Sequence, residues 1–165
     1  MHAITRFTLF ALAAICATAL SQAAIAAVVQ QSQIMLSADN CQAALPAFDG
    51  NIRKRPLAMQ NDGTTPAFVT CGFKGLGIDP HSAGNDLIGV ALTTQGSQSV
   101  SVTCTLVNGF SEPVYLTQTR TVHPGVANLL FWTGNGLDLA AMSCSLPPQT
   151  GILYTMRNYE ETIED

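Results

Sequence analysis

The stretch GIDPHSAGND, residues 77–86, gathers the residue types in this chain that are best suited to chemistry. It places Asp79, His81 and Asp86 in what we expect to be one loop, and loops carry most binding groups. Oxygen-rich loops suit calcium, but this spacing does not match the D-x-[DN]-x-[DN]-G ligand pattern. A solvated turn before the strand at Leu87 is therefore the simpler interpretation, and the three residues are retained as a candidate ligand loop.

No other set of residues has a catalytic signature. A Ser-His-Asp triad could be drawn from His81 or His123, but the chain contains no G-x-S-x-G nucleophile turn. His123 is better placed to open the turn made by Pro124 and Gly125. Because glycosidase carboxylates must face each other across the substrate, Glu160 and Glu161 in the tail do not suggest such a site. We therefore predict no catalytic residue and no cofactor.

Of the five cysteines, Cys16 lies in the N-terminal apolar run, which leaves Cys41, Cys71, Cys104 and Cys144. An even number in an exported chain favours disulfides. Zinc sites usually bring two ligands close in sequence, and here no C-x-x-C pair is present, so no metal site is predicted. Four cysteines allow three pairings, and the sequence does not choose among them. We favour Cys41–Cys71 and Cys104–Cys144, which are 30 and 40 positions apart.

The segments around three of these cysteines alternate in polarity. In SVSVTCTLV, residues 99–107, Val102, Cys104 and Leu106 share one face of a strand, and serines and threonines occupy the other. AFVTCGF around Cys71 and AMSCSL around Cys144 follow the same pattern. The alternation predicts buried cysteines that bridge to the facing sheet or to a neighbouring strand. Burial in apolar surroundings makes a thiol inert rather than nucleophilic.

The N-terminal residues resemble a targeting signal rather than part of the folded domain. A basic residue, an apolar run over Phe7–Leu20 and the small-residue sequence Ala24-Ile25-Ala26 have the layout of a secretory signal peptide. The run is shorter than the ~20 residues that span a membrane. We therefore expect a signal peptide over residues 1–26, one domain over residues 27–165, and an exported protein, periplasmic or extracellular, that is not embedded in a membrane.

Charge excludes one class of partner. Charged residues make up 11% of the chain and its net charge is −4. Nucleic-acid binding requires many clustered Lys and Arg residues, so we predict that the protein does not bind nucleic acid. Arg53, Lys54 and Arg55 form one short basic cluster, which we interpret as a solvated face or as partners of the acidic tail YEETIED. We expect that tail to fray into solvent.

Short β-branched or alternating runs separated by turn residues predict an all-β fold, an antiparallel β-sandwich of the immunoglobulin-like or jelly-roll type with two disulfides. Trp132 is expected in the core or at a strand end rather than as an exposed sugar platform. The segment 37–55 is expected to be an irregular connection that is held by Cys41 and contains one helical turn. The predicted strands cover residues 28–36, 56–60, 67–74, 87–94, 99–107, 114–122, 126–132, 139–146 and 151–158.

The pattern SVTCTL, then LLFW, then MSCSLPPQTGILYTMRNYEE resembles the C-terminal half of a group of uncharacterised exported bacterial proteins. Those proteins pair a C-T-L strand with a C-x-L-P-P strand. The matching positions here are Cys104-Thr105-Leu106 and Cys144-Ser145-Leu146-Pro147-Pro148. The resemblance implies export, β-structure and a Cys104–Cys144 bridge. It implies no activity.

These observations favour an exported, non-enzymatic protein with a binding, surface or structural role, whose partner would be a glycan or a cell-surface protein. Two alternatives remain open. One is a small exported hydrolase that uses the Asp79–Asp86 loop. The other is a pilus-type subunit, in which the alternating segment VVQQSQIML, residues 28–36, would be donated to a neighbour.

Overall fold

The computed structural model describes residues 27–73, 85–109, 112–135, 137 and 140–163. These residues form eleven strands and two short helical turns. The elements are β1 (Ala27–Leu36), α1 (Ser37–Asn40), β2 (Cys41–Ala43), η1 (Pro46–Phe48), β3 (Ile52–Arg55), β4 (Ala58–Asn61), β5 (Ala67–Gly72), β6 (Asn85–Thr94), β7 (Val100–Asn108), β8 (Val114–Val122), β9 (Asn128–Asn135), β10 (Ala140–Leu146) and β11 (Thr150–Ile163).

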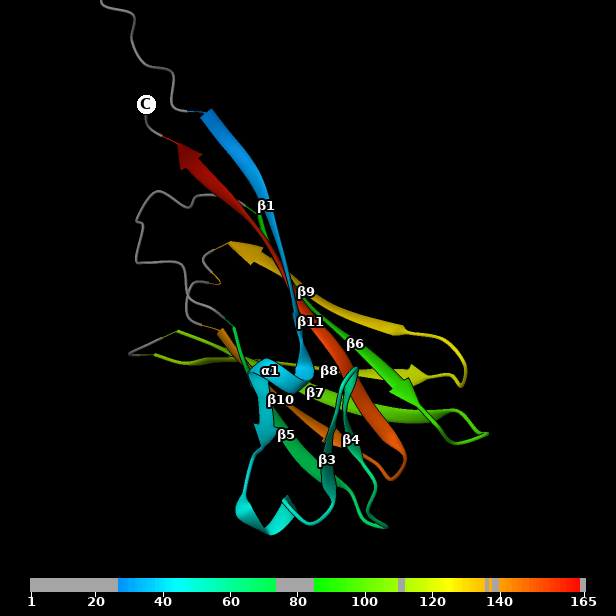
Figure 1. Cartoon of the computed structure of the whole chain (residues 1–165). Helices are drawn as coiled ribbons and strands as arrows, with labels where there is room; N and C mark the ends of the chain where they lie inside the picture. The colour runs from blue at the N-terminus through cyan, green and yellow to red at the C-terminus, as the bar shows by residue number, and fades with distance from the viewer. Residues whose placement is uncertain (1–26, 74–84, 110–111, 136, 138–139, 164–165) are drawn as a thin grey trace, which may run out of the picture.

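Two antiparallel sheets make up the sandwich (Figure 1). The six-stranded sheet has the order β3-β4-β11-β6-β9, and β1 pairs with β11 beside this path. The five-stranded sheet has the order β2-β5-β10-β7-β8. The predicted fold class, an antiparallel β-sandwich, is confirmed. The long strands lie close to their predicted ranges, except that β11 continues to Ile163. Alternation of apolar and polar residues identified the strands around Cys71, Cys104 and Cys144, because such strands have one buried face.

The core lies between the sheets. Ile88, Val90 and Leu92 of β6 face Val102 and Leu106 of β7, and all five side chains have no exposed surface. Trp132 is 2% exposed, and its Nε1 donates a hydrogen bond to the carbonyl oxygen of Leu116 at 2.8 Å. Of the two positions expected for Trp132, the core is the one observed, and its ring is not exposed as a platform for a ligand.

Both disulfides have the favoured pairing, Cys41–Cys71 and Cys104–Cys144. Each joins directly opposed residues of neighbouring strands in the five-stranded sheet, with Cα atoms 4.0 Å apart. Of the two arrangements expected from the alternation, the bridge to a neighbouring strand is the one observed. All four cysteines are at most 2% exposed. The bridges therefore hold β2 to β5 and β7 to β10 from inside the core.

The segment 37–55 is more regular than expected. It contains two helical turns, α1 and η1, where one was expected, and β2 and β3 are strands that the sequence did not predict. They are only three and four residues long, too short to show alternation. Their pairing comes from partners that follow them in the chain, β5 for β2 and β4 for β3.

The prediction that the acidic tail frays is wrong for its backbone up to Ile163. In β11, residues 159–163 pair with residues 27–31 of β1, which lies beside β11 in Figure 1. Gln30 Nε2 also donates a hydrogen bond to Glu160 Oε1 at 2.5 Å. Backbone hydrogen bonds to a strand from the other end of the chain keep the tail extended, and local composition cannot reveal such a partner.

Candidate functional site

The candidate ligand loop is divided by the structure. Asp79 and His81 lie outside the described residues, so their role stays a prediction. Asp86 lies in strand β6 rather than in a loop, and it is 2% exposed. Its carboxylate is turned into the sandwich and is not presented to solvent.

The Asp86 carboxylate contacts other buried groups of the fold. Its Oδ2 lies 3.8 Å from a terminal guanidinium nitrogen of Arg157, and accepts a hydrogen bond from the Leu137 backbone N–H at 3.0 Å. Arg157 is fully buried in β11, and its guanidinium lies 5.6 Å from the centre of the Tyr159 ring. Buried charges in proteins are usually paired with an opposite charge, because burying an isolated charge costs much free energy. We interpret Asp86 and Arg157 as a pair that joins β6, β11 and the segment after β9.

Ser99 and His123 form the nearest approach to a catalytic arrangement among the described residues. Ser99 Oγ lies 2.8 Å from His123 Nδ1. The backbone N–H and carbonyl of His123 both bond to the side chain of Asn128. Among the described residues, no carboxylate is hydrogen-bonded to the imidazole, so none of them orients His123 as a catalytic base requires. The pair supplies two of the three members of a triad, and it lies outside the Asp79–Asp86 loop on which the hydrolase alternative rests.

Part of the outer face of the six-stranded sheet is apolar. Since Ile88, Val90 and Leu92 point into the core, the residues between them on β6 point outward. Backbone register places two rows of residues across β1, β11, β6 and β9. The first row is Ile34, Met156, Gly89 and Phe131, and the second is Leu36, Tyr154, Ala91 and Leu129. We call these eight residues the apolar rows.

The apolar rows combine buried and exposed surface. Ala91 has no exposed surface even though it faces outward, whereas Ile34 is 64% exposed and Phe131 is 37% exposed. A Cβ atom on Gly89 would lie 2.7 Å from Phe131 Cδ1 and 2.8 Å from Met156 Cγ. The absence of a side chain at Gly89 therefore lets Phe131 and Met156 lie over the strand. The result is an apolar covering on the outside of the sheet.

A pocket of about 360 Å³ lies at the end of this face nearest the β3–β4 hairpin. It adjoins the apolar rows, because Thr93 is the next outward position after Ala91 on β6 and Leu153 is the neighbour of Tyr154 on β11. Apolar surface predominates in its walls. The lining residues are Arg55, Pro56, Leu57, Ala58, Gln60, Thr93, Gln95 and Leu153.

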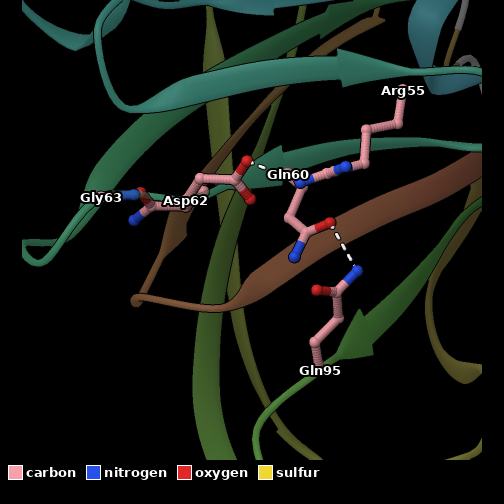
Figure 2. A network of polar contacts seen from close by, with 6 residues as sticks. Arg55, Gln60, Asp62, Gly63 and Gln95 are labelled. Atoms are coloured by element: carbon pink, nitrogen blue, oxygen red, sulfur yellow. Dashed lines mark hydrogen bonds and ion pairs between the residues drawn. The ribbon is translucent and has the colours of Figure 1, made fainter.

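Polar groups of the pocket form an ordered network, shown in Figure 2. Gln95 Nε2 donates a hydrogen bond to Gln60 Oε1 at 2.8 Å, and Arg55 donates to Asp62 Oδ2, also at 2.8 Å. Gln60 is 2% exposed, which fixes its amide, while the Arg55 side chain is 50% exposed. The pocket therefore presents the exposed amide of Gln95, held in place by the buried amide of Gln60, and the Arg55 guanidinium, whose charge is balanced by Asp62.

The basic cluster is exposed, which agrees with the prediction of a solvated face. Arg55 pairs with Asp62 across the β3–β4 hairpin, and Lys54 Nζ donates a hydrogen bond to the Ala38 carbonyl at 3.3 Å. Within the described part of the chain, no three His, Cys, Asp or Glu residues are grouped so that they could hold a metal ion. No helix among the described residues has the length and apolar character needed to cross a membrane.

Sequence reasoning missed the outer face of the six-stranded sheet, although a signal was present. LIGVAL in β6 and LLFW in β9 are apolar without alternation. A continuous apolar run is typical of a strand covered on both faces. The pocket has no comparable signal, since β4, β6 and β11 meet there only in the tertiary structure.

Comparisons with known proteins give fold likenesses only. No family model and no curated protein matches the chain. The C-terminal CBM6 of LamC, a laminarinase from Zobellia galactanivorans, aligns at a TM-score of 0.48 and 9% identity, over 77% of this chain and 98% of that one.

Two further solved structures also align. The CBM22-1–GH10 modules of xylanase 10B from Clostridium thermocellum align at a TM-score of 0.45 and 11% sequence identity. The alignment covers 81% of this chain and 26% of theirs. The chain thus matches about a quarter of that longer protein. A structure of the disulfide-linked pili of Bacillus endospore appendages aligns at a TM-score of 0.35 and 14% sequence identity. That alignment covers 81% of this chain and 88% of the other. At these values the likeness describes the β-sandwich and carries no ligand or assembly across to this chain.

Proposed function

We propose that the protein is an exported, non-enzymatic binding protein whose ligand is a neutral glycan, held on the outer face of the six-stranded sheet. One observation carries the proposal. The apolar rows run directly into the pocket, where the amides of Gln60 and Gln95 and the guanidinium of Arg55 are held by hydrogen bonds. Ligand sites typically combine apolar and aromatic walls with a few convergent polar groups.

The chemistry of this surface matches that of a sugar. A pyranose ring has an apolar face of C–H groups and a rim of hydroxyls. Aromatic and aliphatic side chains such as Phe131 and Leu57 can cover the apolar face, and amide groups can both donate to and accept from hydroxyls. Contiguous exposed apolar surface in a soluble protein commonly marks an interaction site.

The charge balance favours a neutral ligand over an acidic one. The apolar rows contain no charged residue, and the one cation in the pocket, Arg55, is paired with Asp62. The chain as a whole carries a net charge of −4, which would repel an acidic polysaccharide. Export is supported by the two disulfides, because such bonds persist in oxidising compartments.

A glycan array followed by titration calorimetry tests the proposal with two matched variants. Leu57 lines the pocket and is 71% exposed, and Leu45 is 57% exposed and does not line it. Leu57→Asp should weaken binding of any array hit at least tenfold, about 1.4 kcal/mol, by placing a hydrated charge in the wall. Leu45→Asp should bind as the unaltered protein does. An array without hits, or equal affinities for the two variants, would refute the proposal.

A further inference from the structure

The outer face of the six-stranded sheet has a second feature far from the pocket. Phe131 lies on β9, the edge strand opposite to β3, whose last residue, Arg55, lines the pocket. The Phe131 ring covers Gly89 of the neighbouring strand and is 37% exposed. It is the exposed aromatic ring at the far end of the first apolar row.

The two ends are well separated. From β9 to β4 the sheet order crosses β6 and β11, which is three strand spacings of about 4.8 Å. Along β6, Gly89 under Phe131 is four residues from Thr93 in the pocket, at about 3.4 Å per residue. The diagonal from Phe131 to the pocket is therefore on the order of 20 Å, several times the width of one sugar ring.

The surface between these ends is continuous. Ala91, Tyr154 and Leu129 lie side by side in the second apolar row, between Phe131 and the pocket residue Thr93. Tyr154 is partly exposed and carries a hydroxyl, so this middle region can contact both the apolar face and the rim of a sugar. The apolar rows contain no charged residue, so the surface between Phe131 and the pocket is uncharged.

We infer that the ligand is an extended chain of several neutral sugar residues that lies diagonally across the strands, with one sugar in the pocket and another against Phe131. This inference rests on the proposed function and adds the ligand's minimum length and its direction. A monosaccharide or disaccharide reaches only one end. Gly89 and Met156 act as positioning residues, because they set the place of the Phe131 ring on the sheet.

The test is a length series measured by titration calorimetry, with cello-oligosaccharides and laminari-oligosaccharides from disaccharide to hexasaccharide as probes. We expect the affinity of the unaltered protein to rise at least tenfold over one of the two series. In Phe131→Ala that rise should disappear, while the affinity for the disaccharide stays unchanged. In Leu57→Asp the affinity should fall for every length.

Two controls keep the test sharp. Phe68→Ala removes a phenylalanine that is 45% exposed on β5 of the other sheet, and it should leave the length series unchanged. Phe131→Leu keeps an apolar cover over Gly89 but removes the ring, so its affinity should not rise with oligosaccharide length. It serves as the test variant if Phe131→Ala does not fold.

The outcomes separate the two proposals. Binding that is independent of length, or a rise that survives in Phe131→Leu, would overturn the extended-chain inference and leave the pocket as a glycan site. Failure of every probe and every array glycan to bind would overturn the proposed function itself.

Discussion

Replacing Asp86 with alanine tests whether this residue is structural, as its burial indicates, or a ligand group of the candidate loop. The substitution leaves the buried Arg157 guanidinium without the carboxylate 3.8 Å away, and removes the acceptor of the Leu137 N–H. At that distance and an effective dielectric constant of about 20, the lost attraction is about 4 kcal/mol. Removing one member of a buried pair typically costs about 3–5 kcal/mol.

We therefore expect Asp86→Ala to lower the free energy of unfolding by about 4 kcal/mol, and to lower Tm by on the order of 10 °C. Urea denaturation followed by circular dichroism measures the first quantity, and calorimetry measures the second. Asp86→Asn keeps an acceptor for Leu137 but loses the charge, so its loss should be smaller.

The double variant Asp86→Leu/Arg157→Met is the matched control. Replacing a whole buried ion pair with apolar residues of similar volume is often neutral or stabilising. It should therefore be more stable than Asp86→Ala alone. If Asp86→Ala loses less than about 1 kcal/mol, or if the double variant is the less stable of the two, the pair does not work as argued.

Two further predictions concern stability. Replacing Cys104 and Cys144 together with alanine should lower the free energy of unfolding by about 4 kcal/mol, because the bridge closes a 40-residue separation in the unfolded chain; an unchanged urea midpoint would contradict this. Ser37→Ala should cost about 1–3 kcal/mol, since the buried Ser37 hydroxyl donates to the Ile152 carbonyl and accepts from the Met59 N–H. Ser37→Thr, which keeps the hydroxyl, should lose less in the same urea titration, and equal losses would show that the hydrogen bonds are not the cause.

Most of the fold could be predicted from the sequence where one face of a strand is buried. Around Cys104 the alternation indicated the strand, its inner face and the burial of the cysteine, because the side-chain period of a strand is two. One disulfide pairing was favoured, but three were compatible with the spacing of the cysteines. Register decided among them, by placing Cys104 opposite Cys144 and Cys41 opposite Cys71.

The same reasoning failed where structure depends on a distant partner. Residues 159–163 have the composition of a frayed tail, yet they pair with residues 27–31 from the other end of the chain. Asp86 follows a polar loop sequence, and only the position of Arg157, 71 residues later, shows that its carboxylate is buried and paired.

The sequence by itself determined the fold class, the inner faces of the strands and the burial of the cysteines, because these depend on local periodicity. The candidate site was decided by tertiary structure alone. Gly89, Phe131 and Met156 meet because three strands are hydrogen-bonded in one register, and the pocket forms because the β3–β4 hairpin lies beside the start of β11. Such neighbours arise from strand order, which is a property of the whole chain and leaves no periodic trace in any one segment.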